Sequence, residues 1–456
     1  MKSKIRKIHM VGIGGSGMSG IAEVLLNLGY QVSGSDRARN EAINRLVSLG
    51  ARIYQEHRPE NVGDVEVVVK STAIGPENLE VQKAIESGIP VIPRAEMLAE
   101  LMRLKTGIAV AGTHGKTTTT SLLGTVFKEA GMDPTVIIGG RLNSYGSNAL
   151  MGQGDYLVAE ADESDGSFLC LLPIMSIVTN IDTDHLDYYS NMQEIEEAFV
   201  QFLNKIPFYG VNVVCGDDPI LRRLQSRIKR SVFTYGFEAD NDLRAEIIDT
   251  GMKTEFSVFY HGSYWADIKI SLPGTHNVLN TLGVIGLCLQ VGMSRQEILQ
   301  GLDSFGGVSR RLEFKGESGG VPVIDDYGHH PRELQVTIRT VREMYPAKRV
   351  FVVFQPHRFS RTQALFGDFC KAFTEADEVL VTDVYPAGED PIPGVNGFNL
   401  AQGVKQVSKV SAGYCSDLDD CLQVLKQKVV PGDVLLTLGA GNVYKLGEGY
   451  IGDSAG

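Results

Sequence analysis

Hydrophobic residues recur along the chain in short runs that are separated by longer amphipathic stretches. In the first hundred residues, apolar runs lie at 7–11, 31–33 and 65–69, and a helical pattern over 19–28 ends at Gly29. Short apolar runs predict buried strands, and helical stretches between them predict crossover connections between parallel strands. The start of the chain therefore predicts a doubly wound, Rossmann-like sheet.

The same rhythm returns twice further along. Later apolar runs lie at 107–111, 156–159, 177–179 and 211–214, and then at 323–324, 350–354, 379–381 and 434–438. Between these two sets, the runs 256–260 and 264–268 flank a turn that contains Gly262, which is typical of an antiparallel hairpin. The pattern predicts an α/β chain in which the central sheet is mostly parallel with an antiparallel edge.

The length supports several domains, because 456 residues exceed what one hydrophobic core usually organises. The points where the strand–helix rhythm restarts predict three domains, over 1–105, 106–309 and 310–456. We expect the first and third domains to be Rossmann-like. Glycine contributes 51 residues, which indicates many tight turns and close backbone approaches.

Charge and cysteine content narrow the class of protein. The formal net charge of −12 argues against a general nucleic-acid or membrane-surface binder, although placed cations can still hold anionic substrates. The six cysteines are scattered and form no CxxC pair, so we expect reduced thiols rather than a zinc site or a disulfide framework. The sequence shows no secretory signal and no apolar span of membrane length. We therefore expect a cytoplasmic enzyme.

A phosphate-binding loop follows the strand predicted at 107–111. The sequence GTHGKTTT over 112–119 lies between this strand and a helical pattern, which is the context that such a loop requires. It is a shortened GxxGK[ST] loop, because Val110 stands where the longer motif has its first glycine. We predict that it binds nucleotide phosphates through Gly112, Thr113, His114, Gly115, Lys116, Thr117 and Thr118, with Lys116 at the β- and γ-phosphates.

Two acidic segments follow the next strands of the central domain. EADESD begins at Glu160, and NIDTDHLD contains His185. Because ligands of open parallel sheets bind at the carboxyl ends of the strands, these segments and the phosphate loop are expected to converge. We predict that Thr117, Glu160 and His185 hold a divalent metal such as Mg²⁺. The alternative is that the acidic residues only cap helices or face solvent.

A second glycine loop lies near the start of the chain. GIGGSG over 12–17 follows a strand, and Asp36 comes about twenty residues later. This spacing is typical of NAD-binding proteins, but glycines and a helix N-terminus can bind any pyrophosphate, and an acid can bind any ribose. The residues alone leave both NAD and a nucleotide sugar open.

The motifs together resemble those of the Mur ligases, the ATP-dependent amino-acid ligases of peptidoglycan synthesis. The resemblance rests on GTHGKTTT, EADESD and NIDTDHLD, in that order, followed by GTHNVLN at 274–280, DDYGHHP at 325–331 and PHRFSRT at 356–362. It is strongest to the subgroup that adds alanine. Several relatives carry a lysine shortly after the histidine of the second acidic segment; the alanine-adding subgroup lacks it, and this chain has none there.

The resemblance implies a reaction and its substrates. The lactyl carboxylate of UDP-N-acetylmuramate would attack the γ-phosphate of ATP, and the amine of L-alanine would take the acyl group from the resulting acyl phosphate, with release of ADP and phosphate. The glycine loop would then bind the UDP diphosphate rather than NAD. The residues implied for the UDP-sugar are Gly12, Gly14, Gly15, Ser16, Gly17, Asp36, Ser71, Thr72, Ala73 and Arg94.

The resemblance also implies roles elsewhere in the chain. His276, Asn277 and Asn280 match the segment that holds adenine, and Asp325 lies where the family contacts the ribose. Arg311, or its neighbour Arg310, would reach the ATP phosphates. The residues implied for catalysis, besides Lys116, Glu160 and His185, are Tyr327 and His329 on the alanine and muramic-acid side, and Arg358 and Arg361 at anionic substrate groups.

Three rival functions remain open on the sequence. A recycling ligase would add a tripeptide to the same UDP-sugar, and such enzymes tend to carry Phe-Ala where this chain has Tyr327-Gly328. An NAD-dependent oxidoreductase and a non-catalytic nucleotide sensor are the others. We expect small-molecule substrates, no nucleic-acid or membrane partner, and a monomer or weak dimer. The sequence is silent on regulation, on Mg²⁺ against Mn²⁺, and on serine or glycine in place of alanine.

Overall fold

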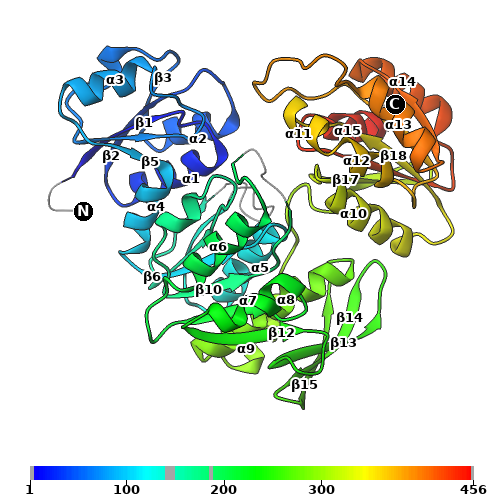
Figure 1. Cartoon of the computed structure of the whole chain (residues 1–456), viewed down its shortest axis with the longest axis horizontal. Helices are drawn as coiled ribbons and strands as arrows, with labels where there is room; N and C mark the ends of the chain where they lie inside the picture. Colours follow the sequence, from blue (N-terminus) through cyan, green and yellow to red (C-terminus); the bar gives the residue numbers. More distant parts are fainter. Residues whose placement is uncertain (1–4, 139–148, 184–187, 453–456) are drawn as a thin grey trace. The chain divides into compact units, whose positions relative to one another are not determined.

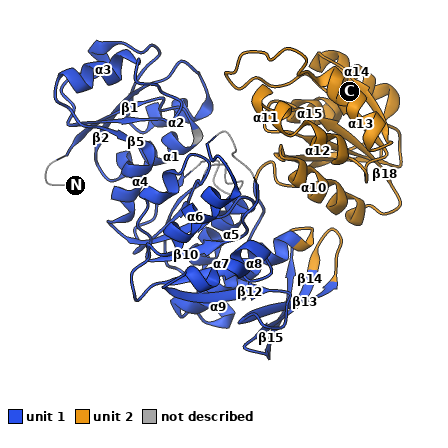
Figure 2. Cartoon of the chain, in the orientation of Figure 1, with its two compact units in different colours: residues 1–248, 255–271, 276–308 blue, residues 249–254, 272–275, 309–456 orange. Residues whose placement is uncertain are grey.

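The computed structural model describes residues 5–138, 149–183 and 188–452. The chain divides into two compact units, the first comprising 1–248, 255–271 and 276–308 and the second 249–254, 272–275 and 309–456 (Figure 2). Two sheets lie in the first unit and one in the second (Figure 1). Strands alternate with helices over most of the chain, which confirms the predicted α/β class.

The sheet nearest the N-terminus is parallel throughout its described strands. In sheet order these are β3 (Arg52–Tyr54), β2 (Gln31–Ser35), β1 (Lys7–Val11), β4 (Val67–Lys70) and β5 (Val91–Pro93). The connecting helices are α1 (Ser16–Asn27), α2 (Glu41–Ser48), η1 (Pro59–Asn61), α3 (Leu79–Glu86) and α4 (Arg94–Met102). The chain leaves β1 toward β2 and returns to β4 on the other side. The loops after β1 and β4 therefore meet at a topological switch point, where ligands bind in such sheets.

The central sheet carries the predicted antiparallel edge on a mostly parallel frame. In sheet order its described strands are β15 (Ser263–Ile270), β14 (Thr254–Tyr260), β13 (Leu243–Asp249), β12 (Ser231–Gly236), β11 (Val211–Cys215), β10 (Met175–Val178), β6 (Thr106–Ala111), β9 (Tyr156–Glu160), β7 (Thr135–Ile137) and β8 (Ala149–Leu150). The helical segments around it are α5 (Lys116–Glu129), η2 (Ser167–Cys170), α6 (Met192–Leu203), α7 (Pro219–Leu224), η3 (Gln225–Arg227), α8 (Thr275–Val291) and α9 (Arg295–Asp303).

The hairpin of β14 and β15 forms where the sequence predicts it. Its turn residues His261 and Gly262 have φ values of +46° and +76°. Positive φ at both central positions is the geometry of a two-residue turn whose twist matches that of the flanking strands. The Ser257 hydroxyl donates to the Asp267 carboxylate across the two strands at 2.6 Å.

The third sheet places side chains in a core on each face. In sheet order its described strands are β16 (Glu313–Ser318), β17 (Val321–Asp326), β21 (Asp433–Leu438), β18 (Arg349–Phe354), β19 (Glu378–Val381) and β20 (Ser411–Tyr414). The helices are α10 (Pro331–Met344), α11 (Phe359–Ala364), α12 (Phe366–Lys371), α13 (Gly397–Val407), α14 (Leu418–Lys428) and α15 (Tyr444–Gly452). Along β18, Val352 and Phe354 pack in one core and Phe351 and Val353 in the other. Both faces are thus covered, as parallel sheets require.

The cysteines are free thiols, and Cys215, Cys288, Cys370 and Cys421 are buried. Cys170 is exposed, and the expectation of reduced thiols stays a prediction. None of the helices in the described ranges combines the length and apolar character needed to cross a bilayer.

A charged side chain lies in the interior of the first domain. Glu80 is fully buried, and its carboxylate accepts hydrogen bonds from Asn61 Nδ2 at 2.6 Å and from the Ser35 hydroxyl. His57 Nδ1 lies 3.0 Å from Glu80 Oε2, and His9 Nε2 lies 3.5 Å from Oε1. Burial alone would raise the pKa of Glu80, but the hydrogen bonds of His9, Ser35, Asn61 and His57 lower it to about 2.

Replacing Glu80 with Gln is expected to destabilise the first domain by about 3–5 kcal/mol, because it removes one partner of a buried charged network. The lowered pKa means that the ionised carboxylate stabilises the fold above its unfolded-state pKa of about 4.3, and that this stabilisation is lost as the pH falls toward 2. The variant should therefore show a flatter decline of unfolding free energy over that range. Urea unfolding at several pH values measures the loss of unfolding free energy and its pH dependence. Hydrogen exchange of the peptide that contains β1 reports the loss in the first domain. Glu86→Gln, at the exposed end of α3, is the matched control, and an equal loss there would contradict the assignment.

Candidate functional site

The phosphate loop connects β6 to α5 through backbone that only glycine adopts readily. Gly112 and Gly115 have φ values of +128° and +86°, in the left-handed region. Among the described residues no side chain caps the N-terminus of α5. The first N–H groups of the helix therefore point into the loop, where the helix dipole favours an anion.

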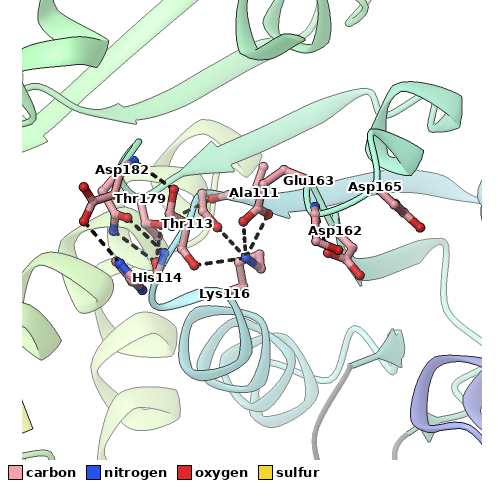
Figure 3. A network of polar contacts seen from close by, with 12 residues as sticks. Ala111, Thr113, His114, Lys116, Asp162, Glu163, Asp165, Thr179 and Asp182 are labelled. Atoms are coloured by element: carbon pink, nitrogen blue, oxygen red, sulfur yellow. Dashed lines mark hydrogen bonds and ion pairs between the residues drawn. The ribbon is translucent and has the colours of Figure 1, made fainter. Parts of the chain in front are cut away.

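The end of β10 holds the loop in this shape (Figure 3). The backbone N–H of His114 donates to Asn180 Oδ1 at 2.9 Å, and the carbonyl of His114 accepts from the Thr179 hydroxyl at 2.6 Å. Asp182 N–H donates to the Thr113 hydroxyl at 2.9 Å, and Asp182 Oδ2 lies 3.4 Å from His114 Nε2. These contacts bring the second acidic segment against the phosphate loop, as strand order predicts.

Close packing restricts both loop glycines. A Cβ at Gly112 would collide with the Thr179 hydroxyl, and one at Gly115 would lie 2.5 Å from Asn280 Oδ1. Asn280 Nδ2 in turn donates to Asn277 Oδ1 at 3.1 Å. The start of α8, which carries His276, Asn277 and Asn280, therefore packs on the phosphate loop.

Lys116 is the cation of the loop, and its contacts with the described residues lie within the central domain. Its Nζ lies 2.8 and 2.9 Å from the two carboxylate oxygens of Glu163, and it donates to the carbonyls of Gly112 at 2.7 Å and Thr113 at 3.1 Å (Figure 3). Burial disfavours the charged ammonium, but the charges of Glu163 and Asp162 outweigh this effect and raise the pKa of Lys116. The lysine is therefore protonated at neutral pH.

The predicted metal ligands are only partly within the described residues. Thr117 lies in the first turn of α5, and Glu160 ends β9; His185 lies outside the described residues. In the described part of the chain no three His, Cys, Asp or Glu side chains are grouped to hold a metal ion. A hydroxyl and a single carboxylate nevertheless fit Mg²⁺, which usually keeps several waters and binds through substrate phosphates.

A pocket joins the glycine loop of the first domain to the central domain. It has a volume of about 240 Å³. Its lining includes Gly15, Gly17, Ser71, Thr72 and Arg94 from the first domain and Glu160 and Asp162 from the central one. Arg94 begins α4, and its guanidinium lies 3.4 Å from Asp162 Oδ2. Five of the residues predicted for the UDP-sugar thus share one pocket with a predicted metal ligand.

The remaining predicted UDP-sugar residues shape the loop or lie beside it. The Gly14 N–H donates to Asp36 Oδ2 at 2.7 Å, so Asp36 holds the loop from the end of β2. Gly12, with φ of +79°, packs against Ser71. Ser16 is the first residue of α1, three residues before the predicted start, because the extended residue Gly15 serves as the N-cap. Ala73 is exposed in the loop after β4.

In the second unit, the structure distinguishes the two arginines that the sequence leaves open. Arg310 donates from Nε to Asp325 Oδ2 at 2.9 Å and from its other nitrogens to the carbonyls of Gly441 and Gly439. Arg311 lies over the Tyr327 ring at 5.4 Å and 3.8 Å from Glu333, and its side chain is 31 % exposed against 19 % for Arg310. The guanidinium of Arg310 is thus hydrogen-bonded to the protein itself, and Arg311 is the more solvent-accessible of the two cations.

The carboxylate of Asp325 is also buried and hydrogen-bonded within the protein. It is 1 % exposed, and it accepts from Arg310 and from the Thr437 hydroxyl at 2.6 Å. Burial raises the pKa of Asp325, although the charge of Arg310 opposes the shift. In this structure Asp325 positions Arg310, and the predicted ribose contact stays a prediction.

Aromatic and imidazole rings form a row at the carboxyl ends of β17 and β18. The Tyr327 and His329 rings meet edge to face at 5.5 Å, and His357 lies 5.8 Å from His329 and stacks on Tyr385 at 5.5 Å. Burial, together with the charge of Arg361, lowers the pKa of both His329 and His357 to about 4. Both imidazoles are therefore neutral at neutral pH, and they lie beside a cation that suits an anionic substrate.

Arg358 adopts an unusual backbone conformation at the start of α11. Its φ is +70°, in the left-handed region, and its Nε donates to Glu389 Oε1 at 2.6 Å. Glu389 also accepts from the backbone N–H of Ser360 at 3.0 Å and from its hydroxyl at 2.6 Å. These bonds lower the pKa of Glu389 to about 2 despite its desolvation. One carboxylate thus holds both the guanidinium of Arg358 and the first turn of the helix.

The sequence does not single out three residues that organise these sites. They are Glu163, Asn180 and Glu389. Glu163 and Asn180 lie inside motifs that the sequence identifies. Their position after predicted strands could therefore have marked them as candidate site residues. Glu389 contacts a residue 31 positions earlier, and nothing in the local pattern marks it.

Known protein families and relatives match nearly the whole length of this chain. The family models described as "Mur ligase family, catalytic domain", "Mur ligase middle domain" and "Mur ligase, glutamate ligase domain" match residues 7–106, 110–288 and 310–441. A UDP-N-acetylmuramate–L-alanine ligase of Nitratidesulfovibrio vulgaris is 59 % identical over 451 residues, which cover 99 % of each chain.

Solved structures give the same result. The crystal structure of a UDP-N-acetylmuramate–alanine ligase from Thermotoga maritima matches with a TM-score of 0.84 and 30 % identity over 98 % of both chains. A murein peptide ligase from Psychrobacter arcticus matches with a TM-score of 0.71 and 23 % identity over 98 % of both chains, and shares the fold. Sequence models, full-length relatives and three-dimensional fold therefore agree that the chain belongs to the Mur ligase family.

Proposed function

We propose that this protein joins L-alanine to the lactyl carboxylate of UDP-N-acetylmuramate at the expense of ATP, with release of ADP and phosphate. The observation that carries the proposal is the match, over 99 % of the chain, to a relative that is named for this activity. The geometry supports it, since a phosphate loop with a partly buried, protonated lysine suits phosphoryl transfer.

The chemistry has two steps, and both gather negative charge. A carboxylate oxygen of the sugar forms a bond to the γ-phosphorus while the bond to ADP breaks. The alanine amine then attacks the acyl carbon and loses a proton, and phosphate leaves. We assign Lys116 to the transferring phosphoryl group, and Arg358 and Arg361 to the anionic groups of the substrate. Tyr327 and the neutral His329 would line the amine side.

ATP is the nucleotide of the family, and we propose that it binds along the phosphate loop, from Gly112 to Thr118, and against the start of α8. Mg²⁺, as one or two ions, would be held by Thr117, Glu160 and His185, and would neutralise charge on the transferring phosphate. Arg311 would reach the ATP phosphates and Asp325 the ribose. Each of these assignments can be tested by substitution.

The pocket between the glycine loop and Glu160 suits the UDP-sugar. Its glycines and the start of α1 offer backbone N–H groups to a diphosphate, and Arg94 offers a cation. Glu160, the proposed metal ligand, also lines this pocket. The sugar could therefore extend from the first domain toward the phosphoryl-transfer site. We also propose that the domains end at 105 and 309. The protein would act in the cytoplasm, as a monomer or weak dimer.

A recycling ligase that adds a tripeptide is the alternative. The relatives of about 59 % identity favour alanine addition, whereas the murein peptide ligase matched here is only 23 % identical. The local geometry agrees with glycine at 328. A Cβ at Gly328 would lie 2.8 Å from Asp326 Oδ1, so the alanine that recycling enzymes tend to carry at this position would require Asp326 to move.

Phosphate release that depends on the amino substrate tests this function. With ATP, Mg²⁺ and UDP-N-acetylmuramate present, we expect phosphate release on addition of L-alanine and little on addition of L-Ala-γ-D-Glu-meso-diaminopimelate. Mass spectrometry of the product should show a UDP-sugar larger by one alanine residue. Omission of the UDP-sugar is the control for uncoupled ATP hydrolysis. Turnover with the tripeptide alone would reverse the choice between the two ligases.

A further inference from the structure

The ammonium of Lys116 has no N–H group left for a nucleotide in this structure. An ammonium offers three donors. Those of Lys116 are directed to the carbonyl of Gly112, the carbonyl of Thr113 and the carboxylate of Glu163. The lysine that should meet the nucleotide phosphates is therefore bound to the protein itself.

Glu163 is held in place independently of the lysine. Its side chain is 2 % exposed, so its carboxylate is almost fully removed from water. Its backbone carbonyl accepts from the Tyr189 hydroxyl at 2.7 Å and from the Gly166 N–H at 3.0 Å. The pair is therefore a fixed, desolvated ion pair rather than a mobile surface contact, which would contribute little.

A nucleotide phosphate and this carboxylate compete for the same cation. If the phosphate takes the ammonium, Glu163 gives up its contact with that cation in a buried place, where the loss of a charge partner is costly. If the carboxylate keeps it, two negative groups lie on either side of one ammonium and repel each other. In both cases Glu163 opposes nucleotide binding while it keeps Lys116 charged and directed into the loop.

We propose that Glu163 is a positioning residue that acts as an internal counter-ion, pairing with Lys116 until nucleotide phosphate replaces it. The inference rests on the proposed function, because it requires nucleotide phosphates at this loop. Its consequence is weaker binding of both ATP and ADP than the loop alone would give. The product ADP then leaves faster, because Glu163 recovers Lys116 as the nucleotide departs.

Direct binding of nucleotides to Glu163→Gln tests this role without turnover. The amide keeps the shape and still accepts from Nζ, but it removes the competing charge. We expect Kd to fall about tenfold for both ADP and β,γ-imido-ATP, measured by isothermal titration calorimetry with Mg²⁺ present. In the steady state, KM for ATP should fall with it, and kcat should not rise. A purely structural role would raise KM or lower stability, with no gain in affinity.

Three further variants make the result specific. Asp165→Asn removes a neighbouring charge whose carboxylate accepts from the Ser167 N–H, and it should leave Kd unchanged. In a Lys116→Gln background, Glu163→Gln should no longer tighten binding. Glu163→Asp keeps the charge but draws it back from Nζ, so it should tighten binding less than Glu163→Gln; it also serves if Glu163→Gln does not fold.

Other outcomes would overturn the inference. Unchanged or weaker binding by Glu163→Gln would show that the carboxylate assists the nucleotide or its metal. An equal gain in Asp165→Asn would indicate a general charge effect. If the wild-type protein bound neither nucleotide, the proposed function itself would fail, and that result is distinct from the other two.

Discussion

Replacing Lys116 with alanine is expected to lower the rate of ATP-driven ligation by about 10³-fold. The reason is that phosphoryl transfer depends on positioned cations rather than on covalent help from the protein. Lys116 is the cation on the phosphate loop, it is charged, and the loop directs it to the place where the helix dipole already favours phosphate. Loss of the ammonium removes charge stabilisation where the transition state needs it.

The same substitution leaves UDP-sugar binding largely intact, because that pocket is lined by other residues. Phosphate release gives the catalytic loss, and calorimetry with UDP-N-acetylmuramate gives the retained affinity. Lys116→Ala also removes the cation that contacts the buried carboxylate of Glu163, which lowers stability. The double variant Lys116→Ala/Glu163→Gln separates the two effects: stability should recover and activity should not. Phosphate release at a near-normal rate in either variant would contradict the role of Lys116.

Alanine substitutions at Arg310 and Arg311 are expected to damage the protein in different ways. Arg311→Ala should lower kcat by about 10²–10³-fold, with little change in stability, if Arg311 reaches the ATP phosphates. Its side chain is the more exposed of the two, and its contact with Glu333, at 3.8 Å, is a loose one. Rapid-quench measurement of acyl-phosphate formation and denaturant unfolding of the same samples provide the two readouts.

Arg310→Ala should instead destabilise the third domain by about 3–5 kcal/mol, because it leaves the buried Asp325 without its cation. It also removes the donors that hold the carbonyls of Gly439 and Gly441. Activity per folded molecule should remain within a few-fold of wild type at low temperature. If the folded fraction of Arg310→Ala lost as much kcat as Arg311→Ala, the division between a structural and a substrate arginine would be wrong.

The different environments of Arg310 and Arg311 could not be predicted from the sequence. Adjacent residues in a regular strand would point to opposite faces, but Arg310 and Leu312 both have positive φ, at +59° and +47°. This left-handed path decides which guanidinium turns inward, and no local pattern predicts it, because the surrounding contacts with Asp325 and Gly441 impose it.

Elements with strong periodicity were predicted well. The strand at 7–11 coincides with β1 and the hairpin around Gly262 forms with the expected turn, because a short apolar run specifies the first and a glycine turn between two apolar runs the second. The positions of Gly112, Gly115 and Lys116 after a strand were equally readable. Helix starts were less accurate, as α1 shows, because its cap is a glycine without a side-chain signal.

Long-range partners could not be predicted in the same way. Glu163 meets a lysine 47 positions earlier, and Glu389 meets an arginine 31 positions earlier. Such pairs depend on which strand ends meet in the folded sheets, and a single sequence does not encode this in any local window. The roles of Glu160, Arg358 and Arg361 likewise follow from the family and stay predictions.

The packing around the phosphate loop has a consequence for how its eight-residue motif should be regarded. Gly112 is enclosed by Thr179 and Gly115 by Asn280, residues that come from two other segments of the chain. A free peptide with the sequence of residues 112–119 would lack these walls and would sample many backbone conformations. The affinity for phosphate therefore does not reside in the motif as a portable unit. It is a property of three chain segments assembled together. Grafting the motif alone onto another scaffold would transfer its sequence without the loop conformation that binds phosphate.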